Sequence, residues 1–177
     1  MLKFVHMKKN IVLIGFMGAG KSLVSKRLAN KLKRERVSTD EWIEKEEGKT
    51  IAQIFRDSGE AYFRGREENV VGELSPRENL VIDCGGGVAA NQSNIDLLKK
   101  QGTLFYLKTS PAVVYQRVKN NPFRPLLQVA EPLKEIEALM KTRQAFYEQA
   151  HFVVDTDLHT VEDTAREILE LLAYERT

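Results

Sequence analysis

The sequence predicts an α/β domain in which a five-stranded parallel sheet lies between layers of helices. Short apolar runs alternate with amphipathic segments along the chain, and this alternation is typical of parallel strands joined by right-handed crossovers. The length of 177 residues suits a single domain, and neither a linker nor an internal repeat divides it. We therefore expect one domain over residues 1–177.

The expected strands are short apolar runs, and two of them end at glycine. Ile-Val-Leu-Ile leads into Gly15, and Leu-Val-Ile-Asp-Cys leads into glycines 85–87. The five strands are expected at 10–15, 36–39, 80–83, 103–107 and 151–154.

The expected helices carry apolar residues at helical spacing, such as Val24, Leu28 and Leu32 in the first. A helix over 41–55 is expected to break near Gly48, because glycine is a poor helix former. The segment 120–132 holds three prolines without a clear period and is expected to be a loop. The helices are expected at 21–33, 41–55, 64–74, 91–101, 111–119, 133–149 and about 161–172.

Composition and charge narrow the function classes. Lys and Arg number 27 against 25 Asp and Glu, and a net charge of +2 does not predict nucleic-acid binding. No apolar stretch approaches the roughly 18 residues needed to span a membrane. The single cysteine, Cys84, excludes an intramolecular disulfide and a multi-cysteine zinc site, and fits a reducing compartment. We expect a cytoplasmic monomer with no nucleic-acid or membrane partner.

The strongest motif is Gly-Phe-Met-Gly-Ala-Gly-Lys-Ser at 15–22, which matches the phosphate-binding pattern GxxxxGK[ST] between a strand and a helix. Glycines let successive backbone N–H groups point at phosphate oxygens, and the helix N-terminus adds its dipole. Lys21 is expected to reach the β- and γ-phosphates, and the Ser22 hydroxyl to bind Mg²⁺. The expected phosphate-binding residues are Gly18, Ala19, Gly20, Lys21, Ser22 and Leu23.

Further motifs follow in a specific order. They are the P-loop, Ser38–Glu44, Phe63-Arg64 with Glu67-Glu68, Gly85–Gly87, Arg124-Pro-Leu-Leu and Arg143. In this order and spacing the chain resembles the shikimate kinases over about residues 9–172. The resemblance implies a P-loop kinase fold with strand order 2-3-1-4-5, a substrate-binding region at about 40–75 and a lid at about 120–132. It also implies a transferase that uses ATP and Mg²⁺ to phosphorylate the 3-hydroxyl of shikimate in aromatic amino acid biosynthesis.

The resemblance assigns the substrate site. Arg64 and Arg143 match the clamp for the shikimate carboxylate, which suits the planar, bidentate guanidinium. Glu67 matches the partner that orients Arg64. Phe55 and Phe63 match apolar walls of the pocket. The backbone of Gly85, Gly86 and Gly87 matches the loop beside the substrate ring.

The resemblance also assigns the transfer chemistry. Asp40 matches the acid that orients the reacting hydroxyl and accepts its proton. Arg124 matches a lid arginine that binds ATP and neutralises the transferring phosphoryl group. Arg117 matches the residue packed against adenine. With Lys21, the expected catalytic residues are Asp40 and Arg124.

One departure concerns the metal site. The family usually carries Asp-x-Asp where this chain has Ser38-Thr39-Asp40. The missing acid normally helps to hold water around Mg²⁺, but Asp83 ends the next strand where relatives often have a small or neutral residue. We hypothesise that Asp83 replaces it and binds Mg²⁺ mainly through water. The alternative is that Asp83 caps the glycine loop.

Two other functions stay open at this point. A small P-loop kinase for another carboxylate substrate, such as gluconate, would also use an arginine clamp. A non-catalytic nucleotide-binding module would keep the P-loop alone. Ser38 favours the second alternative, whereas Asp40, Arg124 and the clamp arginines argue against it.

Overall fold

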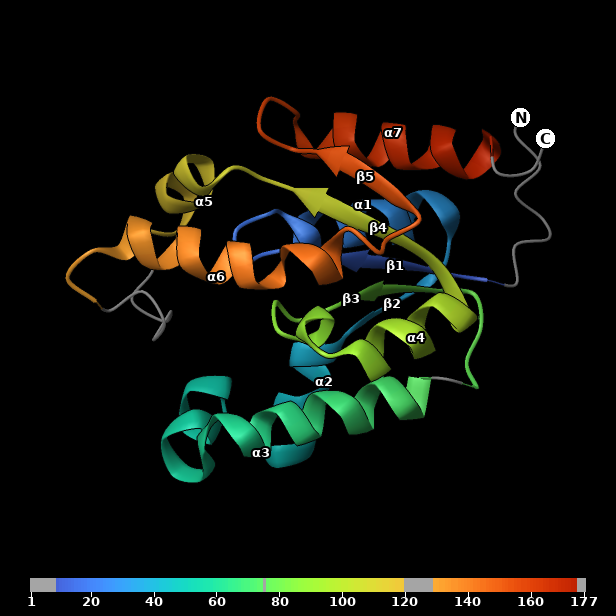
Figure 1. Cartoon of the computed structure of the whole chain (residues 1–177). Coiled ribbons are helices and arrows are strands. Elements are labelled where there is room, and N and C mark those ends of the chain that lie inside the picture. The colour runs from blue at the N-terminus through green and yellow to red at the C-terminus, as the bar shows by residue number, and fades with distance from the viewer. Residues whose placement is uncertain (1–8, 75, 120–128, 175–177) are drawn as a thin grey trace.

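In the computed structural model, five parallel strands form one sheet with helices on both faces (Figure 1). The structure describes residues 9–74, 76–119 and 129–174. The strands are β1 (Asn10–Ile14), β2 (Glu35–Ser38), β3 (Leu80–Asp83), β4 (Gly102–Lys108) and β5 (Phe152–Asp155). Their order is β2-β3-β1-β4-β5, and every neighbouring pair is parallel. The predicted fold class and strand order are confirmed.

Helices cover both faces of this sheet. They are α1 (Lys21–Leu32), α2 (Thr39–Glu47), α3 (Ile51–Leu74), α4 (Gln92–Gln101), α5 (Pro111–Val118), α6 (Pro132–Tyr147) and α7 (Val161–Tyr174), with a short 3-10 turn η1 (Val88–Ala90). Residues of α1 and α7 pack on one face of the sheet, and residues of α3, α4 and α6 pack on the other. In Figure 1, α7 lies above the strands, and α3 and α4 lie below them. No helix among the described residues is both long and apolar enough to cross a membrane.

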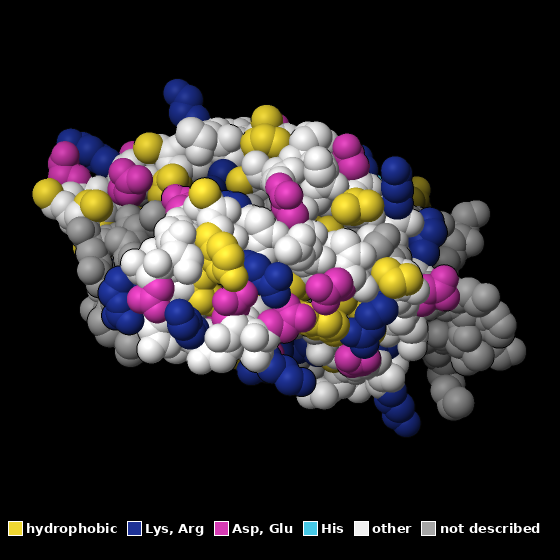
Figure 2. Space-filling view, turned by 90° about the horizontal axis from the view of Figure 1, so that it is seen from below, with side chains coloured by type: hydrophobic (Ala, Val, Ile, Leu, Met, Phe, Trp, Pro, Cys, Tyr) yellow, Lys and Arg dark blue, Asp and Glu magenta, His cyan; other side chains and the backbone are white. Residues whose placement is uncertain are grey.

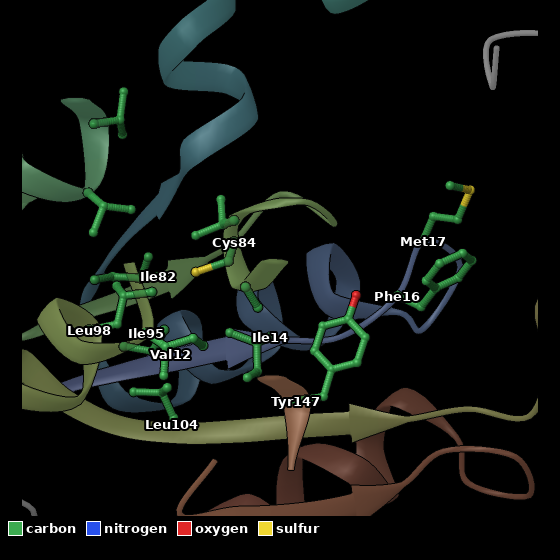
Figure 3. Packing of buried hydrophobic residues seen from close by; sticks show 14 of the residues in the cluster. Val12, Ile14, Phe16, Met17, Ile82, Cys84, Ile95, Leu98, Leu104 and Tyr147 are labelled. Atoms are coloured by element: carbon green, nitrogen blue, oxygen red, sulfur yellow. The ribbon is translucent and has the colours of Figure 1, made fainter. Parts of the chain in front are cut away.

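The alternation of β1 explains the two cores. Ile11 and Leu13 join the core beneath α1 and α7, whereas Val12 and Ile14 join the core beneath α3, α4 and α6. All four are buried, since successive side chains of a strand point to opposite faces. Figure 3 shows Val12 and Ile14 in the second core, which continues to the P-loop residues Phe16 and Met17. The core therefore supports the loop that follows β1.

The boundaries between residues 39 and 74 differ from the prediction. Helix α2 ends at Gly48, as expected, with a left-handed φ of 62°. The expected gap over 56–63 is replaced by two helical segments, 51–58 and 60–74, which together make up α3 (Ile51–Leu74). They meet at a kink at Gly59, whose φ of 82° and ψ of 173° are not helical. Only glycine adopts that conformation at low cost.

The expected lid lies largely outside the described residues, which resume at residue 129. Helix α6 begins at Pro132, the last residue of the expected loop. Proline suits the first turn of a helix because its missing N–H would have no partner there.

Charges of both signs mix on the face that α2 and α3 form. Figure 2 shows basic and acidic side chains interspersed on the surface seen from below Figure 1. Several form ion pairs, such as Arg66 with Glu46 at 2.5 Å and with Glu47 at 2.9 Å. On the face that this view shows, basic side chains therefore lie beside acidic ones.

Candidate active site

The P-loop between β1 and α1 has the backbone that phosphate binding requires. Gly18 and Gly20 have φ values of 76° and 88°, which favour glycine. The N–H of Val24 donates to the Gly20 carbonyl at 3.0 Å, so α1 begins directly after the loop. The Nζ of Lys21 donates to the carbonyls of Gly15 and Phe16 at 2.9 Å each. The lysine therefore lies folded against its own loop.

A cavity of about 200 Å³ lies at this loop. It brings together residues from the P-loop and from the ends of β2 and β3, which is where ligands bind in open α/β sheets. Its lining includes Gly18, Gly20, Lys21, Ser22, Leu23, Ser38, Asp40, Asp83 and Gly85. The Ala19 side chain is instead buried in the core beneath α1, and its N–H donates to the Phe16 carbonyl at 3.2 Å.

Arg117 of α5 lies on the other side of the P-loop. Its Nη1 donates to the Gly18 carbonyl at 3.1 Å, and its Nη2 donates to the Thr156 carbonyl at 2.8 Å. The guanidinium thus links the P-loop to the segment after β5. The expected packing of Arg117 against adenine stays a prediction. Arg124 lies outside the described residues.

A larger cavity of about 630 Å³ adjoins the first. It gathers most of the residues expected to bind the carboxylate substrate, from α2, α3, α6 and the glycine loop. Among its lining residues are Asp40, Phe55, Phe63, Arg64, Glu67, Gly86, Gly87 and Arg143. The rings of Phe55 and Phe63 lie 4.9 Å apart at 45° and form an apolar wall. Met17, Asp40 and Gly86 line both cavities, so the two cavities meet at Asp40.

Arg64 is held in place by two carboxylates on its own helix. Its Nη1 donates to Oε2 of Glu67 at 2.6 Å, and its Nη2 donates to Oε1 of Glu60 at 2.8 Å. Glu67 is buried, and burial raises its pKa to about 7 although Arg64 opposes this shift. The other oxygen, Oε1 of Glu67, is buried and has no hydrogen-bond partner among the described residues. The expected pairing of Glu67 with Arg64 is confirmed.

Arg143 of α6 approaches from the opposite wall. Its Nη1 donates to the Gly86 carbonyl at 2.9 Å, and its guanidinium carbon lies 5.5 Å from the centre of the Phe16 ring. The Tyr147 hydroxyl donates to the same carbonyl at 3.2 Å. Tyr147 is buried and stacks on Tyr106 at 4.9 Å.

The glycine loop passes close to the functional side chains on either side. A Cβ on Gly85 would lie 2.2 Å from Oδ1 of Asp40, and one on Gly87 would lie 1.6 Å from Nη1 of Arg64. The Gly85 N–H also donates to the buried Thr39 hydroxyl at 2.7 Å. The loop therefore needs glycine for this close approach.

Ser38 and Asp83 are paired in register on neighbouring strands. Their side chains therefore leave the sheet on the same face. The Ser38 hydroxyl accepts the Glu41 N–H at 3.3 Å and caps α2. Oδ2 of Asp83 accepts from Nη2 of Arg36 at 2.7 Å, and the Gly85 N–H of the glycine loop donates to the Thr39 hydroxyl and not to Asp83.

Sequence reasoning missed three residues of this arrangement. Thr39 holds Gly85, Arg36 holds Asp83, and Tyr147 shares the Gly86 carbonyl with Arg143. Tyr147 lies four residues after Arg143, and that spacing on a helix places two side chains on one face. The sequence carries no comparable signal for Arg36.

Comparisons with known proteins agree on one family. The family model described as shikimate kinase matches residues 17–173. The shikimate kinase of Pelotomaculum thermopropionicum is 46% identical over 164 residues, which span 93% of this chain and 95% of that protein. A solved structure, the shikimate kinase from Acinetobacter baumannii in complex with shikimate, has a TM-score of 0.91 and 39% identity, and covers 95% of this chain and 94% of that one.

A gluconokinase from Sinorhizobium meliloti has the same fold at greater distance. Its TM-score is 0.63 with 19% identity, over 96% of this chain and 94% of that one. This likeness concerns the fold alone.

Proposed function

The chain belongs to the shikimate kinase family and has that family's activity, and on this premise we propose how its residues perform the transfer. One observation carries the proposal: Arg64 and Arg143 line a cavity that meets the phosphate cavity at Asp40. The 630 Å³ cavity takes shikimate, and the 200 Å³ cavity takes the phosphates of ATP.

Arg64 and Arg143 bind the carboxylate of shikimate. Each presents a planar guanidinium with more donors than its protein partners occupy, so each can keep one contact and form another. The acid–arginine pair of Glu67 and Arg64 fixes one of these guanidinium groups before the substrate arrives. The wall formed by Phe55 and Phe63 packs against the ring and excludes water from the site.

Asp40 orients the 3-hydroxyl for attack on the γ-phosphorus, because it lies where the two cavities meet. As the new oxygen–phosphorus bond forms, the bond to the β-phosphate oxygen breaks, and the hydroxyl proton passes to Asp40 late in the transfer. Lys21 leaves its loop carbonyls to contact the β- and γ-phosphates. Arg117 packs against adenine. Arg124 of the lid neutralises charge on the transferring group.

The phosphate cavity fits Mg²⁺ by the chemistry of its donors. The Ser22 hydroxyl and the carboxylates of Asp40 and Asp83 line it, and Mg²⁺ prefers oxygen. No group of three His, Cys, Asp or Glu side chains in the described part of the chain could hold a metal. Mg²⁺ itself usually keeps several of its waters and is bound through one or two carboxylates and substrate phosphates. When bound, Mg²⁺ neutralises the β- and γ-phosphate oxygens; Ser22 would contact it directly and Asp83 through water.

We also propose that the enzyme acts as a monomer in the cytoplasm, on the route to aromatic amino acids. The single cysteine, Cys84, is buried and unpaired, as suits a reducing compartment.

The test measures ADP release from ATP and Mg²⁺ with shikimate, with gluconate and without an acceptor. We expect strong stimulation by shikimate alone. Release that ignores the acceptor would contradict the proposal. Arg64→Ala is expected to weaken shikimate binding by roughly 2–3 kcal/mol, because a charge-assisted contact is lost. Arg124→Ala is expected to depress turnover far more than shikimate binding. Equal effects of the two variants would contradict the division of roles.

A further inference from the structure

Arg36 connects three elements beneath the phosphate cavity. It lies on β2 with its side chain only 13% exposed. Its Nη2 donates to Oδ2 of Asp83 at 2.7 Å, and its Nε donates to Ser25 Oγ at 2.8 Å. Its Nη1 donates to both carboxylate oxygens of Glu41, at 3.0 and 2.9 Å. The guanidinium is therefore fixed by β3, α1 and α2 together.

The two oxygens of Asp83 have different surroundings. Oδ2 accepts from Arg36, and the Ser25 hydroxyl lies 3.5 Å away from it. No hydrogen bond from the described residues reaches Oδ1, and the side chain lines the cavity that Ser22 also lines. Arg36 thus occupies Oδ2 of a carboxylate that lines the cavity, whereas Oδ1 keeps its capacity to accept a hydrogen bond.

The charges of Arg36, Asp83 and Glu41 determine how the group interacts with a cation. Arg36 is one cation between two anions, Asp83 and Glu41, so the three side chains together keep one net negative charge. A buried carboxylate beside Asp40 and the phosphates would be strongly disfavoured without such a partner. Because Glu41 shares the charge of Arg36, the guanidinium steadies Asp83 without cancelling its attraction for a cation.

We propose that Arg36 is a positioning residue for the divalent cation: it fixes Oδ2 of Asp83 so that Oδ1 faces the water shell of the ion. This rests on the metal role proposed above for Asp83. A guanidinium is suited to the task, because its rigid fork contacts Asp83, Ser25 and Glu41 at once. A lysine would supply one compact charge in place of this fork.

Calorimetric titration of ADP binding, with increasing Mg²⁺ and without shikimate, tests the proposal. We expect Arg36→Gln to raise the Mg²⁺ concentration for half-maximal tightening about tenfold, the effect of losing one charge-assisted contact. ADP affinity in excess chelator and shikimate affinity are expected to stay as in the unmodified protein. The Mg²⁺ concentration that Arg36→Lys requires is expected to lie between those of Arg36→Gln and the unmodified protein.

Arg77→Gln is the matched control. Nη2 of Arg77 donates to both carboxylate oxygens of Glu35, at 2.8 Å each, and Glu35 precedes Arg36 on β2. The control variant is expected to leave the Mg²⁺ titration unchanged. An unchanged titration in Arg36→Gln, or an equal loss of ADP affinity with and without Mg²⁺, would overturn the inference.

Asp83→Asn separates this inference from the proposed metal role. If Asp83→Asn shifts the Mg²⁺ titration and Arg36→Gln does not, only the role of Arg36 fails. If Asp83→Asn also leaves it unchanged, the metal role of Asp83 fails as well. The double variant should require no more Mg²⁺ than Asp83→Asn alone, because Arg36 acts through Asp83.

Discussion

Gly87→Ala is expected to lower the affinity for shikimate strongly while leaving the fold intact. The backbone of Gly87 has φ −98° and ψ −16°, which alanine adopts without strain. The new Cβ, however, would lie 1.6 Å from Nη1 and 2.4 Å from Cζ of Arg64. Ordinary contacts begin at 3.4 Å, so the guanidinium must move by about 2 Å. That displacement breaks the 2.6 Å contact with Glu67 and spoils the clamp.

The displacement leaves the buried Glu67 carboxyl without its arginine partner, so the free energy of unfolding should fall by about 1–3 kcal/mol while the protein stays folded. Loss of a charge-assisted contact to the substrate is worth roughly 2–3 kcal/mol, or about 30- to 140-fold in shikimate affinity. Steady-state kinetics should show this increase in the KM for shikimate, with the KM for ATP unchanged. Thermal unfolding of the same preparation checks the fold.

Gly72→Ala is the control. Gly72 lies on an exposed part of α3 outside both cavities, and a Cβ there would meet nothing within 4 Å. We expect near-normal shikimate affinity. Equal KM values for the Gly72 and Gly87 variants, or normal affinity in Gly87→Ala, would refute the steric reasoning.

Two further predictions concern buried groups beside this loop. Because burial raises the pKa of Glu67 to about 7, its contribution to stability is full below about pH 4.5 and is lost as pH rises through 7. Glu67→Gln should abolish this loss, worth up to about 3 kcal/mol, in urea unfolding compared at about pH 5 and about pH 8; an identical pH dependence in both proteins would disprove it. Tyr147→Phe removes one of the two donors to the Gly86 carbonyl, so Arg143 can turn to the substrate only by leaving that carbonyl unpaired. The KM for shikimate should rise about fivefold to tenfold, whereas Tyr106→Phe, which alters only the stacked ring partner, should bind shikimate normally.

The sequence predicts those features of the structure that depend on neighbouring residues better than those that depend on contacts between distant residues. Short continuous apolar runs predicted the positions of the strands. A strand that is buried on both faces carries apolar residues at successive positions, and this pattern is visible in the local sequence. The end of α2 at Gly48 followed from a local preference too. Gly59 carries the same signal, and it too interrupts a helix: the segments 51–58 and 60–74 of α3 meet at its non-helical backbone.

The residues of the site differ in the same way, because some belong to a contiguous motif and others meet only in the folded protein. Lys21 and Ser22 were found by a contiguous motif, and their places at the cavity follow from the loop geometry. Arg64 and Arg143 were matched only through the resemblance, because the residues that meet in the cavity lie far apart along the chain. Neither the contiguous motif nor the family resemblance pointed to Arg36. Its partners lie on three different elements, and no local pattern marks an arginine that holds another side chain.

The shared wall between the two cavities has a consequence for inhibitor design. Asp40 and Gly86 border both spaces, so the cavity that Arg64 and Arg143 line adjoins the cavity at the P-loop. A single molecule that carries a carboxylate at one end and a phosphate mimic at the other can reach both with a short tether. The second contact then forms within one molecule, at an effective concentration in the millimolar range. Two weak fragments, each selected against one cavity, can therefore be joined across Asp40 into a much tighter ligand.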